Sequence, residues 1–135
     1  MASADDNLRT VQAIYEAFGK GDVDAILDKV TDDVDWATEA ASPDAPWYGP
    51  RKGKDGVASF FRDISGAMDV LEFSPVSFAA NGDEVMAFLE FRMASKETGR
   101  EAAMHLQHYW RLRDGKVEYY RGAEDTAQVV AALAS

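Results

Sequence analysis

The residues best suited to chemistry lie in the second half of the chain, where an apolar stretch carries both histidines. His105 and His108 are three positions apart, a spacing that would place both on one helix face and would suit a metal ion. In a strand, residues three apart point to opposite faces. Because residues 104–112 alternate as a strand does, with His108 and Trp110 in the more apolar set, we expect no metal site unless a bulge shifts the parity.

Two other segments have compositions typical of ion binding. Residues 49–56 are glycine-rich and basic and lead into a predicted helix, which would suit an anion. They match no phosphate-binding fingerprint, so we interpret them as a rim loop with solvated charges. The acidic run of Asp32, Asp33 and Asp35 lacks the glycine and distal glutamate of a calcium-binding loop, so we interpret it as a solvated edge.

Composition excludes several functional classes. The chain has 135 residues, which predicts one domain over residues 1–135. Its formal net charge of -10 opposes attraction to nucleic acid and to anionic membranes. Cysteine is absent, so disulfides and thiolate chemistry are excluded. The acidic, polar N-terminus is unlike a signal peptide, and no stretch is apolar enough to cross a bilayer. We expect a soluble, cytoplasmic protein.

Helical spacing of apolar residues predicts three helices in the first half of the chain. The first covers residues 8–18 and stops at Gly19; the second, over residues 23–30, begins after Asp22 as its N-cap. The third covers residues 55–65. These helices need an apolar surface to pack against, which the second half of the chain must supply.

The pattern of that second half predicts long antiparallel strands. Turn signals recur at Asn81-Gly82, at residues 97–99 and at Asp114-Gly115. A short strand at residues 34–38 and a loop rich in proline and glycine at residues 42–53 precede the third helix. Helices followed by strands indicate an α+β fold. We predict a strongly bent antiparallel sheet with the three helices on its concave face around a cavity.

Strand parity predicts which side chains face this cavity. The odd positions of residues 85–93 are all apolar and should point inward, as should the even positions of residues 104–112. For the last strand both sets are mixed, so parity leaves its orientation open. The opposite face is too aromatic to stay in water, which predicts a homodimer through the outer sheet face; this face carries Met86, Phe88, Gln107, Tyr109 and Tyr119.

The second half also carries a family resemblance. The stretch His108-Tyr-Trp-Arg-Leu-Arg-Asp-Gly-Lys-Val117, ending in Glu124-Asp125-Thr126, resembles the last hairpin of SnoaL-like proteins. These are relatives of ketosteroid isomerase within the nuclear transport factor 2-like superfamily, and residues 14–26, 31–36 and 53–57 are similar to their helical half. The resemblance implies a cone-shaped fold. It also points certain side chains at the cavity, namely Trp36, Thr38, Tyr120, Gly122 and Glu124.

The usual catalytic groups of these relatives are not retained. The resemblance puts Thr38 where ketosteroid isomerases have their carboxylate base and His108 where they have a second acid. Their tyrosine acid corresponds to Ile14, with Tyr15 one position later, and an aspartate of the epoxide hydrolases and polyketide cyclases falls on Gly122. The arginine and second aspartate of the epoxide hydrolases correspond to two apolar residues, Leu89 and Phe91.

The titratable groups that remain inside predict proton transfer without a cofactor. Apolar surroundings raise the pKa of a carboxylate and lower that of an imidazole. We therefore expect Glu124 to act as base beside a carbonyl and His108 to donate a hydrogen bond to the developing enolate, with Tyr120 or Thr38 assisting. The expected ligand is a small apolar or aromatic organic molecule. Its predicted wall consists of Tyr15, Trp36, Thr38, Phe61, Leu89, Phe91, Met104, Leu106, Trp110 and Gly122.

Other interpretations stay open at this point, since this fold also hosts binding modules, hydrolases and dehydratases. His108 would then be a core histidine satisfied by a hydroxyl, and Glu124 would reach solvent. A non-catalytic binding module needs aromatic walls but no paired acid and base. An isomerase or cyclase is our first hypothesis, the binding module the second, and a hydrolase or dehydratase the third.

Overall fold

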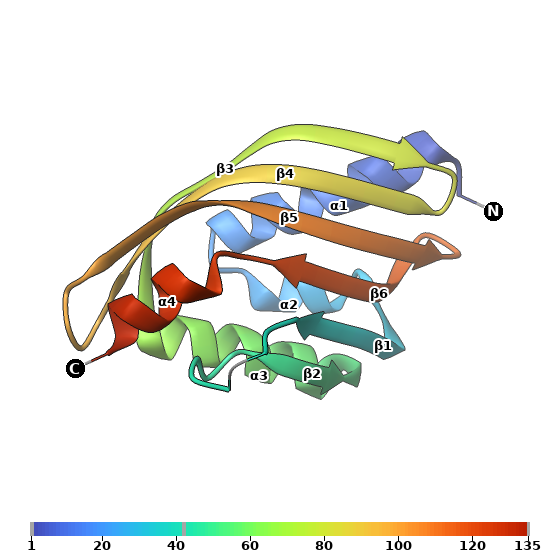
Figure 1. The fold of residues 1–135 in the computed structure, drawn as a ribbon. Coiled ribbons are helices and arrows are strands. Elements are labelled where there is room, and N and C mark those ends of the chain that lie inside the picture. The colour runs from blue at the N-terminus through green and yellow to red at the C-terminus, as the bar shows by residue number, and fades with distance from the viewer. Residues whose placement is uncertain (1, 42, 135) are drawn as a thin grey trace.

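The computed structural model describes residues 2–41 and 43–134. Its elements follow one another as α1 (Ala4–Gly19), α2 (Val23–Leu27), β1 (Val30–Thr38), β2 (Gly49–Lys52), α3 (Gly53–Ala67), β3 (Met68–Asn81), β4 (Glu84–Ser95), β5 (Glu101–Arg113), β6 (Lys116–Ala123) and α4 (Thr126–Leu133). The three expected helices precede the long strands, and the fold is α+β with one curved sheet (Figure 1). None of the described helices is long and apolar enough to span a membrane.

The six strands form a single sheet in the order β2-β1-β6-β5-β4-β3. All neighbours pair antiparallel except β1 and β6, which run parallel. The expectation of a wholly antiparallel sheet is therefore wrong at this one pair. The chain reaches the parallel arrangement because α3 and the β3–β5 meander separate β1 from β6, so β6 can return alongside β1 in the same direction.

Four local predictions need correction. The second helix ends at Leu27, and residue 30 already begins β1. The predicted loop over residues 42–53 contains strand β2, and its Arg51 binds Asp63 and Ser59 of α3 instead of lying free at a rim. The third helix is longer than predicted, because it starts at residue 53. Helix α4 was not predicted, although Asp125 caps it as an N-cap residue should.

Curvature of the sheet comes from β3 and from the turns. The pairing of β3 with β4 shifts register twice, after Val70 and after Pro75, and such bulges bend a strand. A proline is tolerated there because β3 is an edge strand. The β5–β6 turn has positive φ at both Asp114 and Gly115, 52° and 82°, as a tight two-residue hairpin requires. The turns thus hold the long strands in register.

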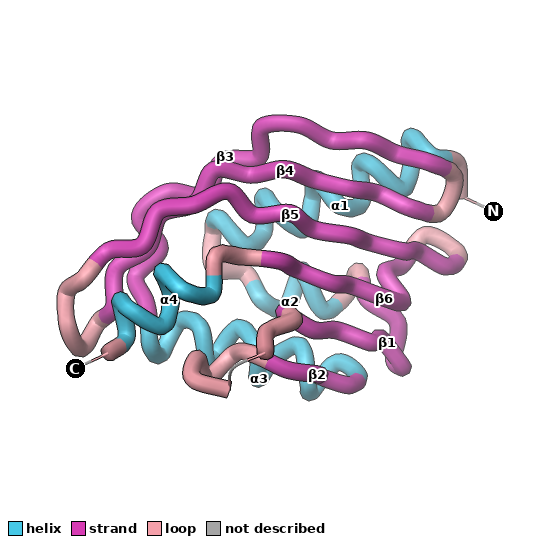
Figure 2. The backbone as a smooth tube through the Cα atoms, in the orientation of Figure 1, coloured by secondary structure: helices cyan, strands magenta, loops and turns pink. Residues whose placement is uncertain are grey.

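Helices α1, α2 and α3 all lie on one face of this sheet, as Figure 1 shows, and α4 packs against β4 and β5. The tube in Figure 2 shows how β3, β4 and β5 bend together toward α4. The inward set of β4 is buried as parity predicts, from Val85 to Met93, and Val11 and Val57 bury the apolar faces of α1 and α3. The core therefore fills the space between helices and sheet.

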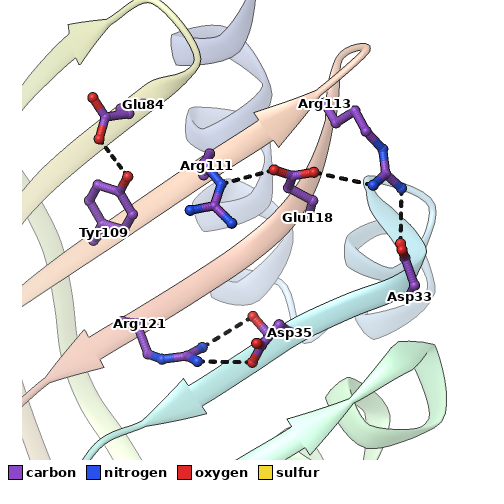
Figure 3. A network of polar contacts seen from close by, with 8 residues as sticks. All are labelled: Asp33, Asp35, Glu84, Tyr109, Arg111, Arg113, Glu118 and Arg121. Atoms are coloured by element: carbon purple, nitrogen blue, oxygen red, sulfur yellow. Dashed lines mark hydrogen bonds and ion pairs between the residues drawn. The ribbon is translucent and has the colours of Figure 1, made fainter.

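The outer face of the sheet carries both charged and aromatic side chains. Ion pairs cross its strands (Figure 3): Arg113 binds Asp33 at 2.9 Å and Arg121 binds Asp35 at 3.0 Å. Arg111 and Arg121 also stack on the Tyr119 ring, 4.4 and 4.1 Å from its centroid. Part of the aromatic surface is thus covered within one chain, while Met86 and Phe88 remain exposed. A homodimer through this face stays a prediction.

The orientation of β4 can be tested by neighbouring substitutions. Leu89 is fully buried and Glu90 is exposed on the other face. We expect Leu89→Ala to lower the free energy of unfolding by about 2–5 kcal/mol through the cavity it leaves. Glu90→Ala should change it by less than about 0.5 kcal/mol. Urea denaturation measures both, and equal losses would contradict the assignment of faces.

Candidate functional site

A narrow hollow of about 60 Å³ lies between the sheet and helices α1 and α3. This is room for a few water molecules. Its wall is largely aromatic, and all three tryptophans of the chain, Trp36, Trp47 and Trp110, belong to it. The polar atoms in the hollow come from a few side chains at its two ends, and these decide what the site can do chemically.

At the first end, α1 and β5 bring three polar aromatic tips together. The indole Nε1–H of Trp110 donates to the Tyr15 hydroxyl at 2.9 Å, and that hydroxyl lies 2.7 Å from Nδ1 of His108. Since an indole can only donate, the hydroxyl accepts from Trp110 and its own proton is available to His108. We therefore assign Nδ1 of His108 as an acceptor and place the imidazole proton on Nε2.

Burial keeps this end of the hollow uncharged. Although part of His108 is accessible, its ring is surrounded by Tyr15, Trp110 and Tyr120, and this burial lowers the pKa of His108 to about 3. Burial likewise raises the pKa of Tyr15. At neutral pH the imidazole is neutral, so Nε2 is a hydrogen-bond donor without a positive charge. No described residue accepts a hydrogen bond from it.

Strand β6 adds a second hydroxyl beside His108. Tyr120 is buried and its hydroxyl interacts with that of Thr38 on β1; burial raises the pKa of Tyr120 well above its ordinary value. That hydroxyl lies over Gly122, where a Cβ would overlap it and would stand 3.4 Å from Cδ2 of His108. Glycine at this position therefore leaves the space in which the tyrosine and the imidazole meet.

At the second end, the segment before β2 contacts the residue that follows β6. Trp47 Nε1 donates to Oε1 of Glu124 at 3.0 Å. Loss of solvation raises the pKa of Glu124, while the hydrogen bond from Trp47 lowers it. The Tyr48 hydroxyl also lies beside this carboxylate: their interaction lowers the pKa of Glu124, and burial, followed by the charge of Glu124, raises the pKa of Tyr48. This carboxylate is thus partly desolvated and held in place.

The structure brings eleven of the thirteen predicted site residues to the hollow. They are Tyr15, Trp36, Thr38, Phe61, Phe91, Leu106, His108, Trp110, Tyr120, Gly122 and Glu124. Leu89 and Met104 do not line it. Leu89 faces inward but is fully buried in the core, and the Met104 sulfur accepts the backbone N–H of Asp125, which turns it toward α4. His105 lies exposed on the other face of β5, so the two histidines are separated as parity predicts.

Several wall residues were not predicted, namely Ile14, Phe18, Trp47, Ile64, Phe73 and Ala123. Trp47 is the most consequential, because it binds the one carboxylate of the hollow. Its segment was predicted only as a loop rich in proline and glycine, over residues 42–53. The available signal was the tryptophan itself, since a large aromatic residue in such a segment usually has to be buried, and Trp47 is 1% exposed.

A curved sheet covered by helices around an aromatic hollow is the architecture of the nuclear transport factor 2-like superfamily, a fold that binds small molecules. Residues 11–120 match the model of the SnoaL-like domain, and the chain therefore belongs to that family. No curated protein matches the chain.

Solved structures are similar over the whole chain. A nuclear transport factor 2-like protein of unknown function from Burkholderia pseudomallei is 25% identical over 100% of both chains, with a TM-score of 0.87. TerC, co-crystallised with polyporic acid, is also 25% identical, over 96% of this chain and 99% of its own, with a TM-score of 0.84. A candidate polyketide cyclase from Xanthomonas campestris is 20% identical over 96% and 98%, with a TM-score of 0.76, a likeness of fold alone.

Removing the Trp47 indole N–H tests the environment of Glu124. We expect Trp47→Phe to raise the pKa of Glu124 further, because the ring is kept while the hydrogen bond that favours the charged carboxylate is lost. A ¹³C NMR titration of the side-chain carboxyl measures this. Trp36→Phe is the matched control, since its buried Nε1 has no partner among the described residues. An unchanged Trp47→Phe titration would contradict the arrangement.

The neutral state of His108 predicts a pH dependence of stability. The unfolded imidazole takes up a proton as the pH falls below 6.5, whereas the folded one stays neutral until about 3. The unfolded state then binds more protons, so stability should fall with pH across this window, by at most about 1.4 kcal/mol per pH unit. His108→Gln should remove this slope and His105→Gln should keep it. Urea unfolding at pH 7, 6, 5 and 4 measures the free energy of unfolding of each variant. If this free energy depends on pH in the same way for wild type and for His108→Gln, the prediction is wrong.

Proposed function

We propose that the protein binds a small, largely apolar organic molecule with a carbonyl group and catalyses a proton transfer beside that carbonyl without a cofactor, as isomerases and cyclases do. Glu124 is the base and His108 the hydrogen-bond donor to the carbonyl oxygen, with Tyr120 or Thr38 assisting. The observation that carries the proposal is the neutral His108, whose Nε2–H is left without a partner among the described residues at a wall shared with a desolvated carboxylate.

The pKa of each group is shifted in the direction that this reaction needs. A carboxylate whose pKa is raised toward neutrality is a better base than one in water, and the pKa of Glu124 is raised by burial. A neutral imidazole donates a hydrogen bond to a developing enolate without first losing a proton. Because Tyr15 supplies the hydrogen bond at Nδ1, the donor at Nε2 is fixed before the ligand arrives.

The proposed step moves one proton and one electron pair. Glu124 removes a proton from the carbon next to the carbonyl, and the electrons of that C–H bond move onto the carbonyl oxygen, which is hydrogen-bonded to His108. If the ligand is a β,γ-unsaturated ketone, the enolate is conjugated with the C=C bond, and return of the proton from Glu124 to the γ carbon shifts the double bond and re-forms the carbonyl, which gives an isomer. Attack of the enolate carbon on a second carbonyl of the same molecule closes a ring, and the new alkoxide then takes the proton.

The character of the wall supports the choice of ligand. Trp36, Trp110 and Tyr120 pack on one another with ring centroids 4.1–5.6 Å apart, and such surfaces take flat or polycyclic molecules. Trp36 also has a buried N–H without a partner among the described residues, which an acceptor oxygen would satisfy. The similar protein TerC, co-crystallised with polyporic acid, supports an organic ligand for this architecture.

A non-catalytic binding module is the second candidate, and one observation favours it. Tyr15 already satisfies Nδ1 of His108, as a core histidine would require. The aromatic wall would bind the same class of molecule in that case, and Glu124 would hold the segment before β2 in place through Trp47.

Substitution of Glu124 separates these two functions. In D₂O, exchange of the methyl protons of acetophenone, followed by ¹H NMR, reports proton removal beside a carbonyl. We expect Glu124→Gln to slow this exchange about 10²–10⁴-fold, the range of a lost general base, while the tryptophan fluorescence change on ketone binding persists. Glu39→Gln is the control, since Glu39 is exposed and pairs with Arg121 outside the hollow. If wild type binds the ketone without accelerating exchange, the binding module is favoured.

A further inference from the structure

A second depression lies on the helix side of the molecule, next to the hollow. It is a groove of about 440 Å³ between the α1–α2 turn, the last turns of α3 and the first half of β3. Gly19 and Gly21 form its edge at the turn, and Met68, Val70 and Leu71 form its edge on β3. The groove is on the helix-covered side of the sheet, so it is separate from the outer sheet face that is predicted to form a dimer.

The groove and the hollow share part of their wall. Phe18, Phe61, Ile64 and Phe73 line both. The Phe18 ring contacts the other two phenylalanine rings, with centroids 5.6 Å from Phe61 and 4.5 Å from Phe73. These four side chains therefore form a single layer of residues between the groove and the hollow, which we call the partition. Phe18, Ile64 and Phe73 are each only partly buried.

The two spaces differ greatly in size. The hollow of about 60 Å³ takes a few water-sized groups, whereas the groove has about 440 Å³. Small-molecule sites in proteins span roughly 300–1,000 Å³. A molecule large enough to make good use of the aromatic wall therefore cannot be contained in the hollow as it stands. The adjoining groove provides the missing volume if the partition side chains change rotamer.

Most of the side chains that line the groove are apolar. Val70 and Leu71 are 39% and 44% exposed, among the most exposed large apolar residues of the described chain. Of the residues that line the groove, Glu72 alone is charged. Exposed aliphatic side chains beside a partly exposed phenylalanine partition favour an uncharged, hydrocarbon-rich ligand segment.

We propose that this groove is the outer half of the binding site, and that it holds the apolar tail of an elongated ligand whose carbonyl-bearing head lies at His108. This inference rests on the proposed function and deepens it by naming the ligand class: a ketone with an alkyl or aryl extension that passes between Phe18, Phe61 and Phe73. The partition opens when the tail displaces it. The groove then discriminates between ligands by the length and polarity of the tail.

A series of alkyl phenyl ketones, from acetophenone to octanophenone, tests this directly. Binding is followed by intrinsic tryptophan fluorescence, because every tryptophan of the chain lines the hollow. We expect the dissociation constant to fall about fourfold for each added methylene until the groove is filled. Leu71→Asp should weaken octanophenone binding at least about tenfold and leave acetophenone binding within about twofold, since one charge opposes burial of the tail alone.

Val76→Asp is the matched control, because Val76 is also exposed on β3, at 56%, and lies outside the groove. Val76→Asp should change the dissociation constant of neither acetophenone nor octanophenone. An affinity that does not depend on chain length, or a Leu71→Asp effect that is equal for both ketones, overturns the groove proposal. If acetophenone binds and the longer ketones do not, the groove proposal is also overturned, while the proposed function is unaffected.

His108→Gln distinguishes failure of the groove from failure of the proposed function. If the head lies at His108, this variant weakens both ketones by the same factor. If the dissociation constant depends on chain length and on Leu71→Asp but is unchanged by His108→Gln, the groove is confirmed as an apolar binding site and the proposed recognition of the carbonyl by His108 is wrong. Absence of any fluorescence change with every ketone contradicts both proposals.

Discussion

The structure depends on burying aromatic rings that carry polar tips. The concave face of the sheet has to be covered, and Trp36, Trp110 and Tyr120 do much of this from β1, β5 and β6. Each ring brings an N–H or O–H into the interior, where an unpaired polar group costs about 1–3 kcal/mol. The hydrogen bonds from Trp110 to Tyr15 and between Tyr15 and His108 solve this problem for Trp110, and Tyr120 interacts with Thr38, whereas the buried N–H of Trp36 has no partner among the described residues. The hydrogen bond from Tyr15 to Nδ1 also determines that Nε2 of the imidazole carries the proton.

The two ends of the hollow solve this problem differently. At the His108 end the groups are neutral and satisfy one another, with Nε2 of the imidazole left over. At the Glu124 end a partly desolvated carboxylate accepts a hydrogen bond from Trp47, a residue from a distant part of the chain. Moving a proton on carbon requires at least a base and a hydrogen-bond donor to the developing oxyanion. The wall of this one apolar space carries a neutral donor and a partly desolvated acceptor.

Much of this arrangement could be predicted from the sequence because it depends on periodicity. Alternation of apolar residues oriented β4 and β5 correctly and so placed His108 and Trp110 inside. The last strand was different: Tyr119 and Tyr120 are equally aromatic, and only the resemblance to SnoaL-like proteins chose between its two faces. The parallel pairing of β1 with β6 has no local signal, since it joins residues about ninety positions apart.

Contacts from irregular segments were beyond such reasoning. The segment containing Trp47 has no period, so nothing in the residues around it indicated that its indole would meet Glu124. Leu89 shows the opposite limit. Its inward direction was correct, yet depth below the surface of the hollow depends on what packs over it, and neighbouring side chains cover it completely.

The place of β6 in the sheet bears on how the chain folds. This strand is the last to be made, but it lies in the middle of the sheet, between β1 and β5. Until it leaves the ribosome, β1 and β5 each have an open edge, and the β2–β1 pair cannot be joined to the β3–β5 part of the sheet. Topologies dominated by such distant pairings fold slowly. Completion of the sheet, and with it the walls formed by Tyr120 and Gly122, is therefore a late event in biosynthesis, which leaves two apolar half-structures exposed to aggregation in the meantime.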